Sequence, residues 1–466
     1  MIAAPKRQEI NLNVTPVFHK NWEAINERTA TGERKYRYII NTGSSRSSKT
    51  FSLIDCIDIY ARSNKNKRCT VWRDTKKSCK DTVLNDALKH LKSTGRYNDN
   101  LYNKTESIFE YNTSSTFEIH GTDDFVTVHG LNQDVAWMNE PYKISREVFD
   151  QIDQRTADFI LIDWNPMKAH WVEDISKDSR AIVIHSTFDD NSFCPPEQRN
   201  KILSYQPVKM CQLVTTGELT EQQANNYDIA VNPLNYSAKL LIELSRCLEN
   251  ERKKSASEYN WSVYGLGLKA ERPNRIFHFD EISTQDYLQL QTDIYYYSDW
   301  GSVDPWAIGE IKYLDGCLYI REKNYKSENI LRAELDPSEL YSINAVDEGL
   351  ISYMFRKLGI GYDHYIICDP NRVTKVRALR EAGYDYAIAP PKPPGSIIDG
   401  IDLLNNLRVF YTSDSLNVKY EQENYSRQVD RYGIVLEEPE DVDNHHMDGT
   451  RYVALFLQSQ GIINKV

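Results

Sequence analysis

The stretch from Tyr36 to Ala61, YRYIINTGSSRSSKTFSLIDCIDIYA, carries residues whose types and spacing suit phosphate binding. A short apolar run leads into a turn rich in glycine and serine, and apolar residues then recur at helical spacing. This pattern predicts a strand, a phosphate loop and a helix. Backbone N–H groups at the start of such a helix point at a bound anion, and the helix dipole adds positive potential there.

The loop fits the spacing G-x-x-x-x-G-K-[ST], except that a serine stands at the second glycine position. Its candidate nucleotide-binding residues are Gly43, Ser44, Ser45, Arg46, Ser47, Ser48, Lys49 and Thr50. We expect Lys49 to reach the β- and γ-phosphates of ATP and Thr50 to offer its hydroxyl to Mg²⁺. The alternative interpretation is a serine-rich cap before an ordinary helix.

A second group of candidates follows the apolar run 135–138. Asn139 and Glu140 come at the C-terminal end of this expected strand, the edge where open parallel sheets carry their chemistry. We expect Glu140 to orient and polarise the water that attacks the γ-phosphate. The residue before it is usually an acid, and because the amide of Asn139 adds no negative charge, the sequence predicts a lower affinity for Mg²⁺. The alternative is that Glu140 caps the helix that begins near Ser145.

Two further apolar runs, residues 159–162 and 181–185, end in polar residues at 163–166 and 186–191. We expect these tips to sense the γ-phosphate and to relay its hydrolysis. Strands with polar tips that alternate with helices predict an α/β fold with a mostly parallel sheet, of the P-loop NTPase kind.

Three aspartates in the C-terminal half suit a different chemistry. Asp299 ends an aromatic run, Asp369 follows an apolar run, and Asp448 lies at the start of the final helix. Carboxylates placed in this way hold two Mg²⁺ or Mn²⁺ ions about 4 Å apart, one activating water and the other stabilising the leaving oxygen of a phosphodiester. Each aspartate taken alone is a common turn or cap residue. The neighbouring pair His445 and His446 is interpreted as an exposed histidine pair at a helix start.

The elements expected around these aspartates indicate a ribonuclease-H-like domain with a mixed sheet. Asp315-Gly316 marks a hairpin turn between two strands. The strands are expected at 294–299, 306–312, 317–323, 365–368 and 386–389, and the helices at about 337–358 and 374–382. Three antiparallel strands, then a helix, then a strand with an acid at its tip are typical of that fold.

The chain of 466 residues is too long for one ordinary core. Gly265, Gly267 and Pro273 mark a change in composition between the two halves. We expect a P-loop ATPase domain over residues 1–270, a linker over 271–290 and a ribonuclease-H-like nuclease domain over 291–466.

Composition excludes several classes of protein. A net charge of −11 argues against a basic coat for non-specific DNA binding, although local basic segments leave DNA as a ligand. Eight cysteines without a C-x-x-C pair favour reduced thiols and make zinc a poor candidate. No apolar run approaches the roughly 20 residues of a membrane span, and the N-terminus lacks the apolar core of a signal peptide. We therefore expect a cytoplasmic protein that does not bind membranes.

The ordered segments GSSRSSKT, VAWMNE, DWNPMKAHW and HSTFDDNSF resemble the ATPase half of the large terminase subunits of tailed bacteriophages, the motors that pump DNA into a procapsid. An Asn-Pro and His-Trp segment of that family is matched by Asn165-Pro166 and His170-Trp171. Its Ser-Thr-aromatic-x-Asp-Asn segment is matched by residues 186–191. The resemblance implies that Arg46 acts in cis as an arginine finger.

The resemblance continues through the C-terminal half, so that it covers roughly residues 36–455. It implies nuclease acids at Asp299, Asp369 and Asp448, the last within the segment HHMDGTRY, where glycine replaces a common alanine. It also implies that Lys392 is the family's lysine before a Gly-Ile helix and that Asp304 is an auxiliary ligand.

The resemblance implies a two-domain packaging motor that uses ATP and Mg²⁺ to move double-stranded DNA and Mg²⁺ or Mn²⁺ to cut concatemeric DNA. The implied partners are double-stranded DNA, a portal protein, a small terminase subunit and further copies of the chain in a ring on the procapsid, in the cytoplasm of the bacterial host. Two alternatives stay open. A transposase or recombinase fused to an ATPase would give joined products, and an ATP-switched DNA-binding scaffold with an inactive nuclease would bind ATP without turnover.

Overall fold

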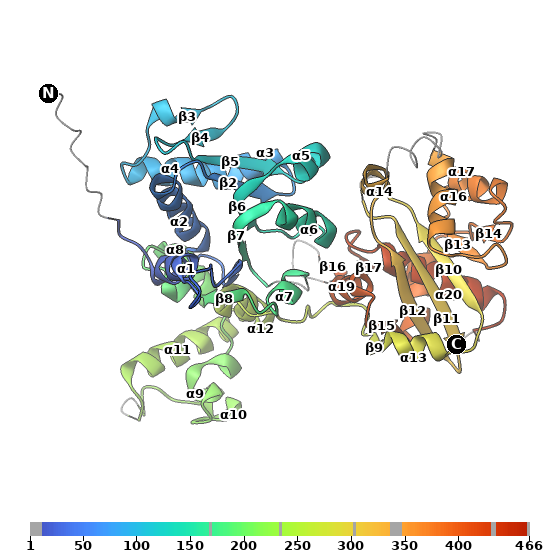
Figure 1. Cartoon of the computed structure of the whole chain (residues 1–466). Coiled ribbons are helices and arrows are strands. Elements are labelled where there is room, and N and C mark those ends of the chain that lie inside the picture. Colours follow the sequence, from blue (N-terminus) through green and yellow to red (C-terminus); the bar gives the residue numbers. More distant parts are fainter. Residues whose placement is uncertain are drawn as a thin grey trace. The chain divides into compact units, whose positions relative to one another are not determined.

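The computed structural model describes residues 12–166, 170–232, 235–301, 304–335, 347–429 and 435–463. The chain divides into two compact units, Met1–Ala270 and Glu271–Val466, each with its own sheet and helices (Figure 1). None of the helices in the described ranges combines the length and the apolar composition that a membrane crossing requires.

An eight-stranded sheet in the order β3-β4-β5-β2-β6-β7-β1-β8 forms the centre of the first unit. Its strands are β1 (Tyr38–Gly43), β2 (Arg68–Arg73), β3 (Tyr102–Asn103), β4 (Ile108–Glu110), β5 (Thr116–Gly121), β6 (Gln133–Asn139), β7 (Thr156–Trp164) and β8 (Ala181–Ser186). The strands from β5 to β8 in this order run parallel, and β3 and β4 add an antiparallel edge. The expected mostly parallel sheet is therefore confirmed.

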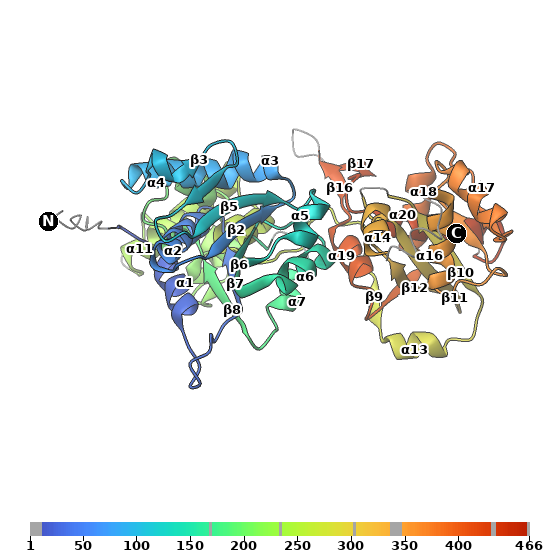
Figure 2. The ribbon, with the colours of Figure 1, turned by 45° about the horizontal axis from the view of Figure 1, so that its top comes forward.

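Helices cover both faces of this sheet, which is why its central strands are near-continuous apolar runs. Ile39 and Val71 point to the face covered by α1 (Pro16–Asn26), α2 (Lys49–Ser63) and α4 (Asn85–Ser93). Ile40 and Trp72, their neighbours along the strands, point to the face covered by α5 (Phe125–Gly130), α6 (Arg146–Gln154) and α7 (Val172–Ile175). Figures 1 and 2 show α2 and α4 on one side of the sheet and α5 and α6 on the other.

Short helices complete the first unit. Between β2 and β3 lie α3 (Lys76–Cys79), the π-helical η1 (Lys80–Leu84) and the 3₁₀ turn η2 (Asp99–Leu101). After β8 come η3 (Phe188–Asp190), α8 (Pro196–Leu203), η4 (Val208–Met210), α9 (Gln212–Thr215), α10 (Glu221–Asn225), α11 (Ala238–Arg252), α12 (Glu258–Asn260) and the π-helical η5 (Trp261–Leu266). Val208, Leu213, Leu244 and Cys247 form a small core of their own in this last group.

The second unit has a seven-stranded sheet in the order β14-β13-β10-β11-β12-β15-β9. Its strands are β9 (Asp280–Ile282), β10 (Ile294–Asp299), β11 (Ala307–Leu314), β12 (Cys317–Asn324), β13 (Ile366–Cys368), β14 (Ala387–Ile388) and β15 (Arg408–Thr412). Strands β10, β11 and β12 are antiparallel, whereas β13 runs parallel to β10, and β14 runs parallel to β13. The expected ribonuclease-H-like mixed sheet is present, and β15 and β9 extend it beyond β12.

Helices also cover both faces of the second sheet (Figure 2). The helices are α13 (Thr284–Gln289), α14 (Glu328–Glu334), α16 (Asp347–Lys357), α17 (Val373–Glu381), α18 (Ser396–Asn405), α19 (Leu416–Asn424) and α20 (His445–Ser459), and a small second sheet pairs β16 (Arg427–Val429) with β17 (Val435–Pro439). The first part of the helix expected at 337–358 lies outside the described residues, and its second part is α16.

The stretch 271–290, which the sequence suggested as a linker, is part of the second unit. Strand β9 pairs in parallel with β15, and the side chains of Phe277 and Tyr287 are fully buried. The reason is physical: three apolar residues, Ile276, Phe277 and Phe279, bury themselves in the core of the second sheet although polar residues surround them in the sequence.

Candidate active sites

The phosphate loop joins β1 to α2, and its conformation explains how serine replaces the second glycine. Ser48 has φ of 69°, in the left-handed region, which costs a residue other than glycine about 1 kcal/mol. Its hydroxyl oxygen lies 2.8 Å from that of Thr15, the residue before α1. The serine thus keeps the backbone conformation that glycine usually supplies and adds a contact to α1.

Lys49 is buried at the start of α2, and loop and strand atoms bind its ammonium group. Nζ donates to the carbonyl oxygen of Ser44 at 2.7 Å, to the hydroxyl of Ser47 at 3.1 Å and to Oδ1 of Asn165 at 2.8 Å. Burial lowers the pKa of Lys49 to about 8, and the charge of Asp163 opposes this shift. The lysine is therefore aimed at the interior of the loop, where a phosphate would accept from it.

The end of β8 supports the loop from its other side. The backbone N–H of Ser44 donates to the carbonyl of Ser186 at 2.9 Å, and the N–H of Phe188 donates to the Ser44 hydroxyl at 2.7 Å. Asn191 Nδ2 donates to the carbonyl of Arg46 at 2.7 Å. The Arg46 side chain itself is exposed, so the candidate arginine finger lies at the surface of the loop.

Glu140 and Asn139 lie at the end of β6, as expected, and a residue that the sequence did not point to binds both. Arg73, at the end of β2, donates from Nη1 to Asn139 Oδ1 at 2.6 Å and from Nη2 to Glu140 Oε2 at 3.2 Å. Glu140 has φ of 46° and its side chain is 42% exposed. Its carboxylate is thus held at the open edge of the sheet, where water can reach it.

Asp163, at the tip of β7, lies closer to the candidate magnesium position than the sequence indicated. Its Oδ2 accepts from the Thr50 hydroxyl at 3.0 Å, and its Oδ1 accepts from the Trp137 indole at 2.7 Å. Burial raises the pKa of Asp163, as does the charge of Glu140, whereas the hydrogen bonds from Trp137 and Asn139 lower it. Together with Asn165, this residue connects β7 to the phosphate loop.

The structure brings the three aspartates of the second unit to one end of its sheet. Strands β10 and β13 pair with Ser298 opposite Cys368, so Asp299 and Asp369 follow side by side, and the Asp369 N–H donates to the Ser298 carbonyl at 3.0 Å. Asp448 lies in the first turn of α20, which packs on β10.

Gly449 permits the close approach of α20 to β10. A Cβ at this position would lie 2.1 Å from Cδ2 of the fully buried Tyr297. The glycine that replaces the family's common alanine is therefore matched to the aromatic ring on the facing strand.

The electrostatic fields of the three carboxylates overlap. Burial raises the pKa of Asp299, and the charges of Asp448 and Asp369 raise it further, whereas the hydrogen bond to His445 lowers it. The pKa of Tyr452, one turn along α20, is raised by burial and then by all three aspartates. A cation between the carboxylates would relieve this repulsion.

Basic side chains neutralise two of these carboxylates. His445 Nδ1 lies 2.9 Å from Asp299 Oδ2, and Arg451 forms an ion pair with Asp448. Over the described ranges, no set of three or more His, Cys, Asp or Glu side chains converges closely enough to hold a metal ion. Asp304, the candidate auxiliary ligand, is exposed, and its charge helps to raise the pKa of His445.

The histidine pair is not the exposed helix start that the sequence suggested. His446 is fully buried, with Nδ1 2.6 Å from the Tyr297 hydroxyl oxygen. The buried carboxylate of Glu421, on α19, accepts from the backbone N–H groups of His446 at 2.6 Å and Met447 at 3.1 Å. The N-terminus of α20 is therefore inserted between the sheet and α19, and this packing directs His445 toward Asp299.

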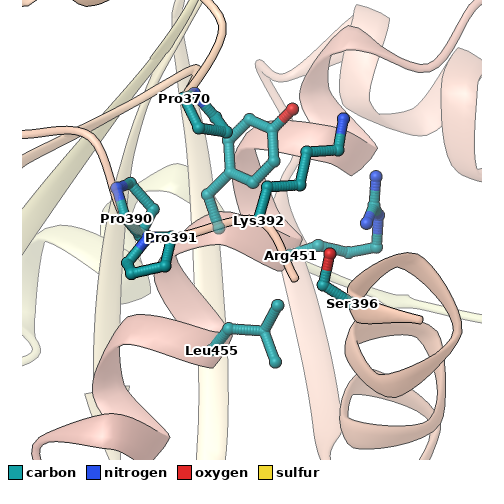
Figure 3. Close-up of a pocket in the computed structure, with 8 residues that line it drawn as sticks. Pro370, Pro390, Pro391, Lys392, Ser396, Arg451 and Leu455 are labelled. Atoms are coloured by element: carbon teal, nitrogen blue, oxygen red, sulfur yellow. The ribbon is translucent and has the colours of Figure 1, made fainter. Parts of the chain in front are cut away.

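A pocket next to these aspartates contains Lys392 (Figure 3). Its lining residues are Pro370, Pro390, Pro391, Lys392, Ser396, Arg451, Tyr452 and Leu455. Figure 3 shows the side chains of Lys392 and Arg451 extending the same way. Two cationic groups thus lie beside the residues that adjoin Asp369 and Asp448.

Comparison with known proteins gives a family for part of the chain. The model of the phage terminase large subunit family matches residues 35–217, which confirms the resemblance to large terminases over that range. A search of curated proteins finds no match.

Solved structures of phage terminases are also similar to this chain. The large terminase of a thermophilic bacteriophage is 16% identical, with 96% of this chain and 99% of that chain covered and a TM-score of 0.40. The large terminase of bacteriophage HK97 is 14% identical, with coverage of 97% and 96% and a TM-score of 0.43. The Mn-bound nuclease domain of the bacteriophage SPP1 large terminase is 23% identical, with coverage of 38% and 96% and a TM-score of 0.32. These values are too low to transfer residue roles.

Proposed function

We propose, from the terminase-family match of residues 35–217, that this chain is a phage large terminase subunit. The first unit would hydrolyse ATP to translocate double-stranded DNA into a procapsid, and the second would cut concatemeric DNA. The observation that carries the proposal is the connection between the phosphate loop and the tip of β7. Lys49 and Thr50 donate to Asn165 and Asp163 there, at the sheet edge where a nucleotide's phosphates would bind.

In the proposed ATPase site, the chain's own groups bind the phosphates and orient the water. Lys49 would exchange its bonds to the loop for bonds to the β- and γ-phosphates, and Thr50 would contribute a hydroxyl ligand to Mg²⁺. Bound Mg²⁺ would supply positive charge against the phosphate oxygens. Glu140 would accept a hydrogen bond from the attacking water, and Arg46 would act in cis on the charge that develops on the γ-phosphate.

In the proposed nuclease site, Asp299, Asp369 and Asp448 would hold two Mg²⁺ or Mn²⁺ ions. Their shared position and mutual repulsion fit that role, and His445 and Arg451 would balance their charge before metal enters. The ions would activate water and stabilise the leaving oxygen.

The exposed Lys392, beside the three aspartates, suits contact with a DNA phosphate. Double-stranded DNA would be the substrate of both units. A portal protein, a small terminase subunit and further copies in a ring on the procapsid would be the partners, in the bacterial host cytoplasm and away from membranes.

The test separates the two activities in the purified full chain. Lys49→Ala should abolish ATP hydrolysis and leave metal-dependent cutting of supercoiled plasmid intact, because the aspartates of the second unit are untouched. Asp369→Asn should do the reverse. The exposed residues Lys65 and Asp363 provide matched controls, Lys65→Ala and Asp363→Asn, which should change neither activity. Unchanged ATP turnover in Lys49→Ala, or unchanged cutting in Asp369→Asn, would contradict the assignment.

The same assay addresses the two alternatives. Joined DNA products would identify a recombinase or transposase. Tight ATP binding without turnover and without cutting would identify an ATP-switched scaffold.

A further inference from the structure

The ATP site lacks a carboxylate at the position where the motif usually has one. Asn139 stands before Glu140 on β6, and an amide carries no charge to attract Mg²⁺, an ion that binds carboxylate oxygens. Its register partner on the neighbouring strand β7 is Asp163. A carboxylate is therefore present in the site, one strand closer to the phosphate loop.

Two contacts connect Asp163 to the expected ligand of Mg²⁺ and to Asn139. Its Oδ2 accepts from the Thr50 hydroxyl at 3.0 Å, so that the lone pairs of this hydroxyl are free to face a cation. Asn139 Nδ2 lies 2.9 Å from Oδ1 and 3.1 Å from Oδ2 of the same carboxylate.

The partners of Asn139 explain why this position holds an amide. Its Oδ1 accepts from Arg73, which can only donate, and its Nδ2 donates to Asp163, which can only accept when ionised. An aspartate at 139 would suit Arg73 but would repel the carboxylate of Asp163. Asparagine at 139 and aspartate at 163 are therefore complementary parts of one arrangement.

The environment of Asp163 also favours a cation. Its side chain is only 2% exposed, and the hydrogen bonds that it accepts come from the neutral groups of Trp137, Asn139 and Thr50. Among the described residues, no Lys, Arg or His forms an ion pair with it. A buried charge without a direct counter-charge is costly unless it coordinates or faces a metal ion.

We propose that Asp163 supplies the negative charge of the nucleotide's Mg²⁺ site in place of the residue before Glu140, acting through Thr50 and the metal's water ligands. The inference rests on the proposed ATPase function. It corrects the expectation that Asn139 leaves the site with lower Mg²⁺ affinity, because the carboxylate has moved to the neighbouring strand.

The test is a charge swap between β6 and β7 in the full chain, with the binding of ATP, titrated with Mg²⁺ or with EDTA, as the readout. In wild type we expect Mg²⁺ to tighten ATP binding. Asp163→Asn should raise the Mg²⁺ concentration needed for half of this tightening by about 10- to 100-fold, as for other residues that act through metal ligands.

The double variant Asp163→Asn with Asn139→Asp should recover most of the loss, because one carboxylate and one amide still face each other. Asp174→Asn, at an exposed aspartate of the same unit, is the matched control and should behave as wild type. Thermal unfolding of each variant reports whether it folds. If Asp163→Asn alone does not fold, the double variant decides: retained Mg²⁺ dependence supports the proposal.

Three outcomes have distinct meanings. Wild type that does not bind ATP overturns the proposed function and this inference with it. Wild type that shows the Mg²⁺ effect while Asp163→Asn shows it undiminished overturns the inference alone. A folded double variant without any recovery also overturns it, because the effect of Asp163 would then come from packing and not from its charge.

Discussion

Ser48 shows how a single residue departs from a motif and keeps its geometry. The left-handed conformation at this position favours glycine, yet the serine adopts it and its hydroxyl bonds to Thr15. The conformational cost and the net gain of one hydrogen bond are each about 1 kcal/mol, so they nearly offset each other. The departure from the motif therefore changes the contacts of the loop with α1 more than its shape.

This balance predicts different effects for two substitutions at the same position. Ser48→Ala should lower the free energy of unfolding of the first unit, because it keeps the strained backbone and loses the bond to Thr15. Ser48→Gly loses the same bond but removes the strain, so it should be more stable than Ser48→Ala by about 1 kcal/mol. Chemical denaturation of the full chain, followed through the transition that ATP shifts, measures the difference. Equal stability of the two variants would contradict the account.

At the scale of elements, the position of α20 decides whether a nuclease site can form. This helix carries His445, Asp448 and Arg451, and the Glu421 carboxylate holds its N-terminus through two backbone N–H groups. A carboxylate at a helix N-terminus also interacts favourably with the helix dipole. The side chains of the site are therefore directed by one buried cap and by the contact of α20 with β10.

The contact between α20 and β10 predicts the effect of adding one methyl group. Gly449→Ala would place a Cβ against the ring of Tyr297, which is fully buried and bonded to His446. The strain should destabilise the second unit by about 1–3 kcal/mol and displace Asp448, so that DNA cutting falls while ATP turnover stays. Plasmid cutting and thermal unfolding measure both effects. Gly130→Ala is the matched control, because nothing lies within 4 Å of its added Cβ; a Gly449→Ala chain that cuts like wild type would refute the argument.

At the scale of the whole chain, two units have separate sheets and separate cores. Buried clusters of the first unit draw on residues before 270, and those of the second draw on residues after 271. The stretch 271–290 belongs to the second of these cores. Each unit is therefore expected to unfold as a unit with its own stability.

This division predicts two thermal transitions in the full chain, of which ATP with Mg²⁺ raises one. A ligand at 100 times its dissociation constant adds about 2.7 kcal/mol to the stability of the unit that binds it. The transition that ATP shifts should be the one lowered by Ser48→Ala, and Gly449→Ala should lower the other. Scanning calorimetry makes the measurement. A single transition that both substitutions lower equally would show that the two units unfold together.

The sequence by itself determined the features that depend on neighbours along the chain. The phosphate loop, the polar tips of β6, β7 and β8 and the hairpin at Asp315-Gly316 all follow from spacing within a few residues. Both sheet types were predicted correctly for the same reason, since the period and order of apolar runs specify parallel or antiparallel pairing.

Only the tertiary structure decided which side chains meet. Thr50 and Asp163 are 113 residues apart, and Arg73 and Asn139 are 66 apart, so no local pattern indicates either contact. His446 is buried because α19 and β10 enclose the start of α20, and residues 271–290 join a core built from segments far along the chain. The physical reason is the same in each case: a local pattern determines which backbone forms, whereas the pairing of charges and the burial of side chains depend on strands and helices that packing brings together.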